Sequence, residues 1–191
     1  SEETTVIYTP AVPEKLAWFN FFKAYNPIKR AQALALIAND HKCIAIAGTH
    51  GKTSTSAMLV HLMDQAGLDP TAFIGGIMTQ TSTNYRLGSD DLIIVEADEF
   101  DRSFMQLDPD IAGITSMDAD HLDIYGDVAT FEKTFYDFAA LLEGKTLLIN
   151  EQLDVKGLQV GLDSGVYQAL NEVIKDGAYH FDFKTPQGVL E

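Results

Sequence analysis

Short apolar runs alternate with amphipathic segments along most of the chain. Each run is followed by glycine or polar residues, as is typical of parallel strands that are buried on both faces of a sheet. Five runs fit this description: Cys43–Ala47, Ala72–Ile74, Leu92–Val95, Ile111–Thr115 and Thr146–Ile149. The pattern predicts an α/β fold with a mostly parallel sheet flanked by helices.

Two segments between these runs have helical periodicity. The first predicts a core-facing stripe, because its apolar residues recur at steps of four, three and four. These residues are Phe131, Phe135, Phe138 and Leu142. The second is expected to begin inside a glycine-containing loop and to end at Gly67 as its C-terminal cap. We expect its apolar face to consist of Met58, Leu59, Leu62 and Met63.

The two ends of the chain differ from this central pattern. Residues 6–9, which precede Pro10 and Pro13, predict a terminal strand and an exit turn. Near the other end, aromatic residues at 179, 181 and 183 alternate after the turn sequence Lys-Asp-Gly at 175–177. This alternation predicts a small antiparallel region at the edge of the domain.

Composition narrows the choice of partners and compartment. With 191 residues, of which 46% are hydrophobic, the chain can form one well-buried domain plus a partial second element. Its formal net charge of −15 disfavours nucleic acid as a partner. The single cysteine, Cys43, lies in an apolar run. Residues 1–5 are acidic, whereas a signal peptide begins with basic residues. No apolar stretch approaches the roughly 20 residues of a membrane helix. We therefore expect a cytoplasmic protein without membrane insertion.

The clearest chemical motif is the sequence Gly-Thr-His-Gly-Lys-Thr at 48–53, between an apolar run and a predicted helix. Such a loop directs backbone N–H groups and the positive end of a helix at phosphates. Lys52 would reach the terminal phosphates of a nucleotide, and Thr53 would offer its hydroxyl to Mg²⁺. The loop is a shortened variant, because Ile46 stands where the longer pattern has glycine. The expected ATP-binding residues are Gly48, Thr49, His50, Gly51, Lys52, Thr53 and Ser54. For His50, both a phosphate contact and a purely structural role remain open.

Acidic residues follow two of the predicted strands. Leu92–Val95 runs directly into Glu-Ala-Asp-Glu at 96–99, and Ile111–Thr115 leads to a segment that contains Asp120 and His121. In open α/β sheets, ligands bind at the carboxyl ends of the strands. Because clustered carboxylates repel one another unless cations hold them, we favour a Mg²⁺ or Mn²⁺ site over a solvated acidic loop, with His121 as a ligand.

Three motifs together resemble the central domain of the Mur ligases in order and spacing. They are the loop 48–53, the block 96–99 and the run Asp-His-Leu-Asp-Ile-Tyr-Gly at 120–126, and the resemblance covers residues 6–150. The histidine of the loop, residues 100–104, residues 75–77 and Asn84 are most similar to the family members that add L-alanine. This resemblance implies ATP-dependent amide formation in peptidoglycan synthesis, in which the lactyl carboxylate of UDP-N-acetylmuramate attacks ATP. The amine of L-alanine then attacks the resulting acyl phosphate.

The resemblance also implies roles for individual residues. Lys52, Glu96 and His121 would be catalytic; Thr53 and Glu96 would hold a Mg²⁺ ion at the phosphates, and His121 with Glu96 a second ion. Weaker candidates for the substrate side are Asn84, Glu99 and Asp120. Some relatives use a carbamylated lysine as a metal ligand, and the pattern does not assign Lys133 that role.

The family comparison predicts a division of the chain. Residues 1–13 would be the last strand of an N-terminal UDP-binding domain, 14–40 a linker with connecting helices, and 41–191 an incomplete central ATP-binding domain, with the C-terminal domain absent. Such a fragment is expected to be inactive alone. Two alternatives stay open: a related ligase that recycles murein peptides, and a nucleotide-dependent switch or transport ATPase, which normally carries the longer loop. The oligomeric state is not predicted.

Overall fold

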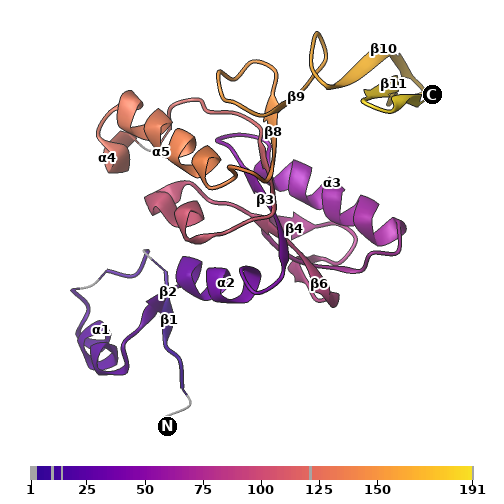
Figure 1. Cartoon of the computed structure of the whole chain (residues 1–191). Helices are drawn as coiled ribbons and strands as arrows, with labels where there is room; N and C mark the ends of the chain where they lie inside the picture. Colours follow the sequence, from indigo (N-terminus) through magenta and orange to yellow (C-terminus); the bar gives the residue numbers. More distant parts are fainter. Residues whose placement is uncertain (1–3, 10, 14, 121, 191) are drawn as a thin grey trace.

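The main body is an α/β sheet that confirms the predicted parallel core (Figure 1). The computed structural model describes residues 4–9, 11–13, 15–120 and 122–190. Over these residues the large sheet has ten strands in the order β12-β11-β10-β9-β8-β7-β3-β6-β4-β5. Its parallel strands are β3 (Lys42–Ala47), β4 (Pro70–Met78), β6 (Ser89–Glu96), β7 (Ile111–Ile114), β8 (Thr146–Asn150) and β9 (Leu158–Gly161). All five predicted strands lie within this set.

Antiparallel strands extend the sheet at both edges. β5 (Thr83–Arg86) pairs with β4 at one edge. At the other edge, β10 (Tyr167–Lys175), β11 (Ala178–Thr185) and β12 (Gly188–Leu190) form an antiparallel meander, and β10 joins β9 in parallel. The predicted antiparallel region near the C-terminus is therefore confirmed.

Helices cover both faces of the sheet and give it two separate hydrophobic cores. On one face, α3 (Lys52–Gln65) packs through Val60 against residues of β3, β4 and β6. The opposite face is covered by α2 (Arg30–Ala38), the 3-10 segment η2 (Phe100–Gln106) and α5 (Val128–Ala140), with the short α4 (Leu122–Tyr125) before α5. Burial of these two apolar surfaces is the main source of stability of such a layered fold.

The aromatic stripe of α5 confirms the sequence periodicity. Phe131, Phe135 and Phe138 are completely buried, and Leu142 is nearly so. Phe138 stacks on Phe104 of η2 with ring centroids 4.6 Å apart and an interplanar angle of 2°. The stripe therefore fixes η2, the segment that follows the acidic strand end, against α5.

The predicted apolar face of α3 was partly wrong. Leu59 and Met63 pack against the core, but Met58 and Leu62 are 59% and 65% exposed. The four residues span more of the helix circumference than one sheet can cover, and the buried side is centred on Val60 instead. The predicted cap is confirmed: Gly67 has φ +77°, and its N–H donates to Asp64 O as expected at a helix C-terminus.

The N-terminal part of the chain forms a small unit beside the main sheet. β1 (Ile7–Tyr8) pairs in parallel with β2 (Ile28–Lys29), and α1 (Ala17–Phe22) and the 3-10 turn η1 (Lys23–Tyr25) lie between them in sequence. The predicted strand at 6–9 corresponds to β1. None of the helices in the described part of the chain has the length and apolar character needed to cross a membrane.

Candidate functional site

The predicted phosphate loop (residues 48–53) connects β3 to α3 and is anchored by the segment that follows β7. Gly48 and Gly51 have φ values of +133° and +84°, which side chains rarely tolerate, and a Cβ on Gly48 would lie 2.1 Å from Thr115 Oγ1. Ser116 accepts N–H bonds from Thr49, at its backbone oxygen (3.2 Å), and from His50, at its hydroxyl (2.8 Å). The loop conformation therefore depends on a second strand end as well as on its own glycines.

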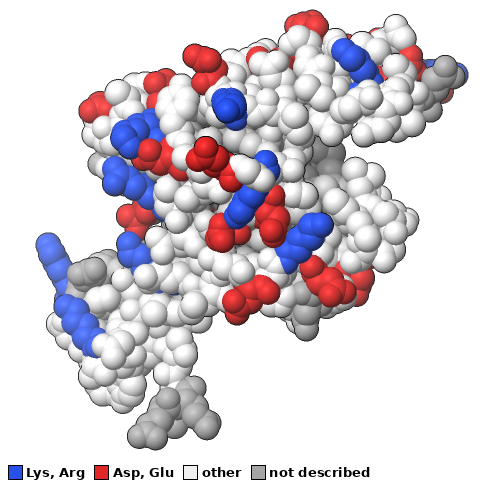
Figure 2. All heavy atoms as spheres, in the orientation of Figure 1, with Lys and Arg blue, Asp and Glu red and all other residues white. Residues whose placement is uncertain are grey.

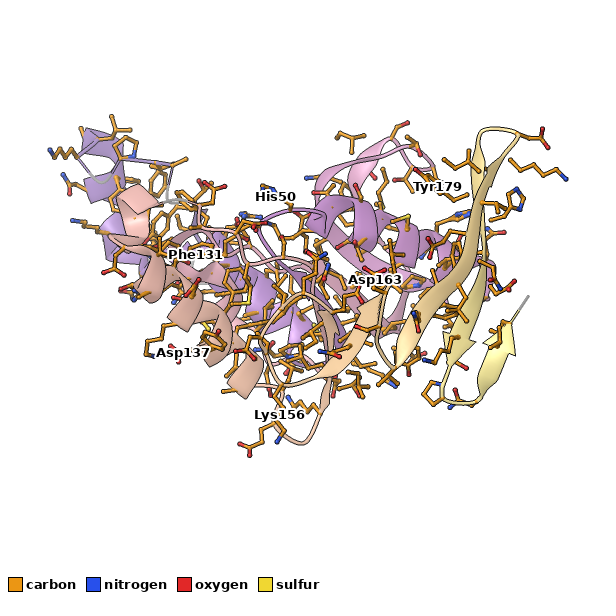
Figure 3. The ribbon with its side chains drawn as sticks, turned by 90° about the horizontal axis from the view of Figure 1, so that it is seen from above. His50, Phe131, Asp137, Lys156, Asp163 and Tyr179 are labelled. Atoms are coloured by element: carbon orange, nitrogen blue, oxygen red, sulfur yellow. The ribbon has the colours of Figure 1, made fainter. Side chains whose placement is uncertain are left out.

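His50 is held through its backbone. The single Thr115 O–H lies between two acceptors, His50 O at 2.5 Å and Ala47 O at 3.1 Å, and His50 as a whole is exposed. In Figure 3 it lies near the beginning of α3, on the other side of the fold from Asp137 and Lys156. These hydrogen bonds fix the backbone of His50 but leave its imidazole accessible.

Lys52, the first residue of α3, forms a largely buried ion pair with Glu99. Its Nζ lies 2.8 Å and 3.0 Å from the two carboxylate oxygens of Glu99 and donates to Gly48 O at 2.5 Å. The side chains are 13% and 3% exposed. Glu99 is fixed in turn, because the Tyr125 hydroxyl donates to its backbone oxygen. Glu99, expected on the substrate side, is thus the direct partner of Lys52.

Thr53 and Glu96 converge beside this pair. Thr53 Oγ1 donates to Glu96 Oε1 at 3.0 Å, and Gly75 N donates to Glu96 Oε2 at 2.7 Å. A Cβ on Gly75 would lie 2.7 Å from Glu96 Oε1, and one on Gly76 would lie 2.7 Å from Thr53 Cγ2. The two glycines of β4 therefore create the space in which the hydroxyl and carboxylate meet.

The donor set at Thr53 and Glu96 fits Mg²⁺ in type. Both groups offer oxygen, and Mg²⁺ is usually held by one or two protein oxygens together with waters and substrate phosphates. Within residues 4–120 and 122–190, apart from positions 10 and 14, no cluster of three or more His, Cys, Asp or Glu side chains suits a metal ion. His121, the predicted second-ion ligand, lies outside the described residues.

A cleft of about 490 Å³ opens in front of these groups. Thr49, Lys52, Glu96 and Glu99 line it together with the other predicted substrate-side residues, Asn84 of β5 and Asp120. Asp98 and Ser103, from the segments 96–99 and 100–104 that the sequence singled out, also line it, as do Arg30 and Tyr85, which the sequence did not indicate. The space is large enough for a small-molecule substrate, and Figure 2 shows acidic and basic side chains intermixed over the middle of the molecule.

The backbone behind the cleft is strained. Asp101 and Arg102 have consecutive left-handed conformations, with φ values of +53° and +55°, which cost non-glycine residues free energy and tend to occur at functional sites. The Arg102 guanidinium lies over the Tyr125 ring, 5.7 Å from its centroid. The pKa of Tyr125 is raised above its ordinary value, mainly because the side chain is partly buried. The hydroxyl therefore stays protonated and can act as a hydrogen-bond donor.

Not every residue considered from the sequence lines the cleft. Ser54, expected at the ATP site, lies in the first turn of α3 and is exposed. Lys133, to which the sequence assigned no metal-ligand role, forms an exposed ion pair with Asp137 one turn further along α5, at 2.6 Å, and nothing in its surroundings indicates such a role. Thr115 and Ser116, which sequence reasoning did not select, follow a strand that ends at the same edge of the sheet as β3, and that position was the available signal.

The sequence comparisons place these features in a known family. The model of the Mur ligase middle domain matches residues 46–159. The chain is 46% identical over 194 aligned residues to a UDP-N-acetylmuramate--L-alanine ligase of Christiangramia forsetii, an alignment that covers 100% of this chain and 43% of the relative. A ligase of the same name from Flavobacterium psychrophilum is 48% identical over 189 residues, which cover 97% of this chain and 42% of that relative. The chain thus spans less than half the length of these relatives.

Solved structures share the fold. The UDP-N-acetylmuramate-alanine ligase of Thermotoga maritima superposes with a TM-score of 0.81 at 23% identity, over 95% of this chain and 44% of that one. The UDP-N-acetylmuramate:L-alanyl-gamma-D-glutamyl-meso-diaminopimelate ligase of Neisseria meningitides superposes with a TM-score of 0.79 at 21% identity. This superposition covers 96% of the present chain and 65% of that one. Because the family model matches more than half of the chain and includes the phosphate loop, Glu96 and the residues around them, the chain belongs to the Mur ligase family and contains its middle domain.

Proposed function

We propose that the protein is an ATP-dependent ligase of peptidoglycan synthesis that joins L-alanine to UDP-N-acetylmuramate. The observation that carries this proposal is that Lys52, at the end of a shortened phosphate loop, and Glu96 line one cleft, with the Thr53 hydroxyl bonded to Glu96. The identity of 46% along the whole chain to a relative with this name supports the choice of substrates. The bacterial cytoplasm, where the nucleotide precursors would be present, is the proposed compartment.

The residues of the site suit phosphoryl transfer, which requires mainly positioning and neutralisation of charge. The N-terminus of α3 and the loop N–H groups would receive the phosphates of ATP, and the Lys52 ammonium would lie against the β- and γ-phosphates. A carboxylate oxygen of the acceptor attacks the γ-phosphorus as ADP leaves. The amine of L-alanine then attacks the acyl carbon, and inorganic phosphate departs with that carboxylate oxygen.

Thr53 and Glu96 are the described residues that would hold Mg²⁺. When bound, the ion supplies positive charge to phosphate oxygens. The chain's own contribution is orientation: Gly75 N fixes one oxygen of Glu96, and the other oxygen faces the Thr53 hydroxyl. A second ion at His121, and Mn²⁺ in place of Mg²⁺, stay predictions.

We also propose the division of the chain expected from the sequence. Residues 1–13 would end the UDP-binding domain, 14–40 would link the domains, and 41–191 would belong to the ATP-binding domain. The separation of the β1–β2 sheet from the ten-stranded sheet supports the boundary near residue 40, whereas β1 and β2 pair across the boundary proposed at residue 13. Since the chain spans 43% of its relative from C. forsetii, we expect these 191 residues alone to bind ATP at most and to show no ligation.

The competing peptide-recycling function is tested by the choice of amine. Full-length protein would be incubated with ATP, UDP-N-acetylmuramate and either L-alanine or the tripeptide L-alanyl-γ-D-glutamyl-meso-diaminopimelate. We expect a coupled product with L-alanine; product only with the tripeptide would overturn the proposal. ATP hydrolysis at full rate without sugar nucleotide and amine would instead support a switch or transport ATPase.

A further inference from the structure

Arg30 is a cation of the cleft for which the proposed chemistry gives no role so far. It is the first residue of α2, and it lines the cleft together with Ala31 and Leu34 of the same helix. Its guanidinium lies 3.7 Å from Asp98 Oδ2, beyond hydrogen-bond distance, and its side chain is 62% exposed. A guanidinium carries five N–H donors, so this loose contact leaves Arg30 able to bind a ligand.

The helix that carries Arg30 is fastened to η2 at both ends. At its start, Lys29 Nζ forms an ion pair with Asp101 at 2.5 Å. At its end, Asn39 donates to Gln106 O at 3.1 Å and accepts from Asp108 N at 2.9 Å. Arg30 is therefore presented to the cleft from a fixed element, which lowers the entropic cost of binding through a long side chain.

The charge balance of the cleft calls for such a cation. The described residues that line it include four carboxylates, Glu96, Asp98, Glu99 and Asp120, but only two cations, Lys52 and Arg30. Lys52 is paired with Glu99 and would face the phosphates of ATP. Mg²⁺ at Glu96 would likewise serve the phosphates of ATP, so a sugar nucleotide with a carboxylate and a diphosphate still calls for a positive group of its own in this cleft.

We propose that Arg30 binds an anionic oxygen group of the acceptor substrate and thereby positions the acceptor beside the phosphate loop. The inference rests on the proposed function, because it takes the acceptor to be an anionic sugar nucleotide. The planar guanidinium matches carboxylate and phosphate oxygens in pairs, and its contact with Asp98 is loose enough to be exchanged for the acceptor. Arg30 is a positioning and specificity residue, and the reacting atoms lie with Lys52, Thr53 and Glu96.

The test is a set of binding measurements by calorimetry on the full-length protein. In R30Q we expect the Kd for UDP-N-acetylmuramate to rise by about tenfold to a hundredfold, as for the loss of hydrogen bonds to a charged group. R30K should recover part of the loss, because it keeps the charge but not the paired donors. The Kd for a non-hydrolysable ATP analogue should stay within about twofold, and in kinetics the KM for the acceptor should rise more than kcat falls.

Lys156 provides the matched control. It is exposed, it does not line the cleft, and Figure 3 shows it on the other side of the fold from His50. K156Q removes one positive charge as R30Q does, so a general effect of net charge would lower acceptor affinity equally in both variants and would overturn the proposal. Unchanged unfolding midpoints for R30Q, R30K and K156Q would exclude a folding defect. If R30Q is unstable, R30K tests the loss of the paired donors at unchanged net charge, and wild-type acceptor affinity of R30K would then contradict the proposal.

UDP-N-acetylglucosamine separates the two anionic groups, because it keeps the diphosphate but lacks the lactyl carboxylate. If R30Q weakens binding of both nucleotides, Arg30 contacts the diphosphate; if it weakens only UDP-N-acetylmuramate, Arg30 contacts the carboxylate. Wild-type affinity of R30Q for the acceptor, or an equal loss for the ATP analogue, would contradict the inference while the proposed function stands. Failure of the wild-type protein to bind UDP-N-acetylmuramate would overturn both.

Discussion

The ion pair between Lys52 and Glu99 makes a quantitative prediction about stability. Nζ contacts both carboxylate oxygens, and the two side chains are 13% and 3% exposed, so water replaces little of the interaction if one partner is removed. Loss of one member of a buried pair destabilises a protein by about 3–5 kcal/mol. Because Lys52 retains some exposure, we expect K52M to lower the free energy of unfolding by about 3 kcal/mol, in addition to removing turnover.

A double-mutant cycle isolates the contribution of the pair. E99Q and the double variant K52M/E99Q would be compared with K52M and wild type by urea denaturation. If Glu99 is destabilising only when its partner is missing, the double variant should be more stable than K52M, with a coupling free energy of about 1–3 kcal/mol. Additive losses would refute the reasoning.

The exposed pair between Lys133 and Asp137 is the matched control for this cycle. Its side chains are 70% and 47% exposed, and the two residues are one helical turn apart. Such pairs contribute about 0.3–0.5 kcal/mol. A coupling free energy for Lys52 and Glu99 as small as the one measured for this surface pair would mean that the buried contact does not persist in solution.

Three further predictions address the cleft, the core and the single thiol. In G75A the new Cβ would lie only 2.7 Å from Glu96 Oε1 and would push this carboxylate aside. We expect turnover to fall by about 10–100-fold, as is usual when the partner that orients a metal ligand is altered. Wild-type turnover would contradict this prediction. F138A should lower the free energy of unfolding by about 3–5 kcal/mol in urea titrations, since the buried ring stacks on Phe104; a loss below about 1 kcal/mol would count against that packing. Burial raises the pKa of the Cys43 thiol to about 12. The stability gained by keeping this thiol protonated is complete below its ordinary pKa of 9.0 and is lost as the pH rises from there through about 12. A thiol-specific disulfide reagent at pH 8 should therefore label the native protein slowly, and immediate labelling would disprove the burial.

The strand pattern and the loop could be predicted because they are local properties of the sequence. The five apolar runs, the α5 stripe and the cap at Gly67 each reflect short-range periodicity or backbone conformation. The apolar face of α3 was harder, because Met58 and Leu62 are apolar but exposed, and only the width of the sheet beneath the helix determines which side is buried.

The partners within the cleft depend on long-range contacts that no local pattern contains. Lys52 and Glu99 are 47 positions apart in sequence, and Arg30 enters the cleft from a helix with no motif of its own. The family resemblance linked Glu96 with Thr53, and the two side chains do meet, but it did not indicate that Glu99 pairs with Lys52. That pairing follows from the direction of the Glu99 side chain beyond the strand end.

The central claim is that the cleft transfers phosphate to a carboxylate before an amide forms. The most direct measurement uses full-length protein, ATP, L-alanine and UDP-N-acetylmuramate labelled with ¹⁸O in its lactyl carboxylate, followed by mass spectrometry of the inorganic phosphate. The account predicts that each amide formed releases a phosphate carrying one carboxylate oxygen. Unlabelled phosphate alongside amide product would contradict it.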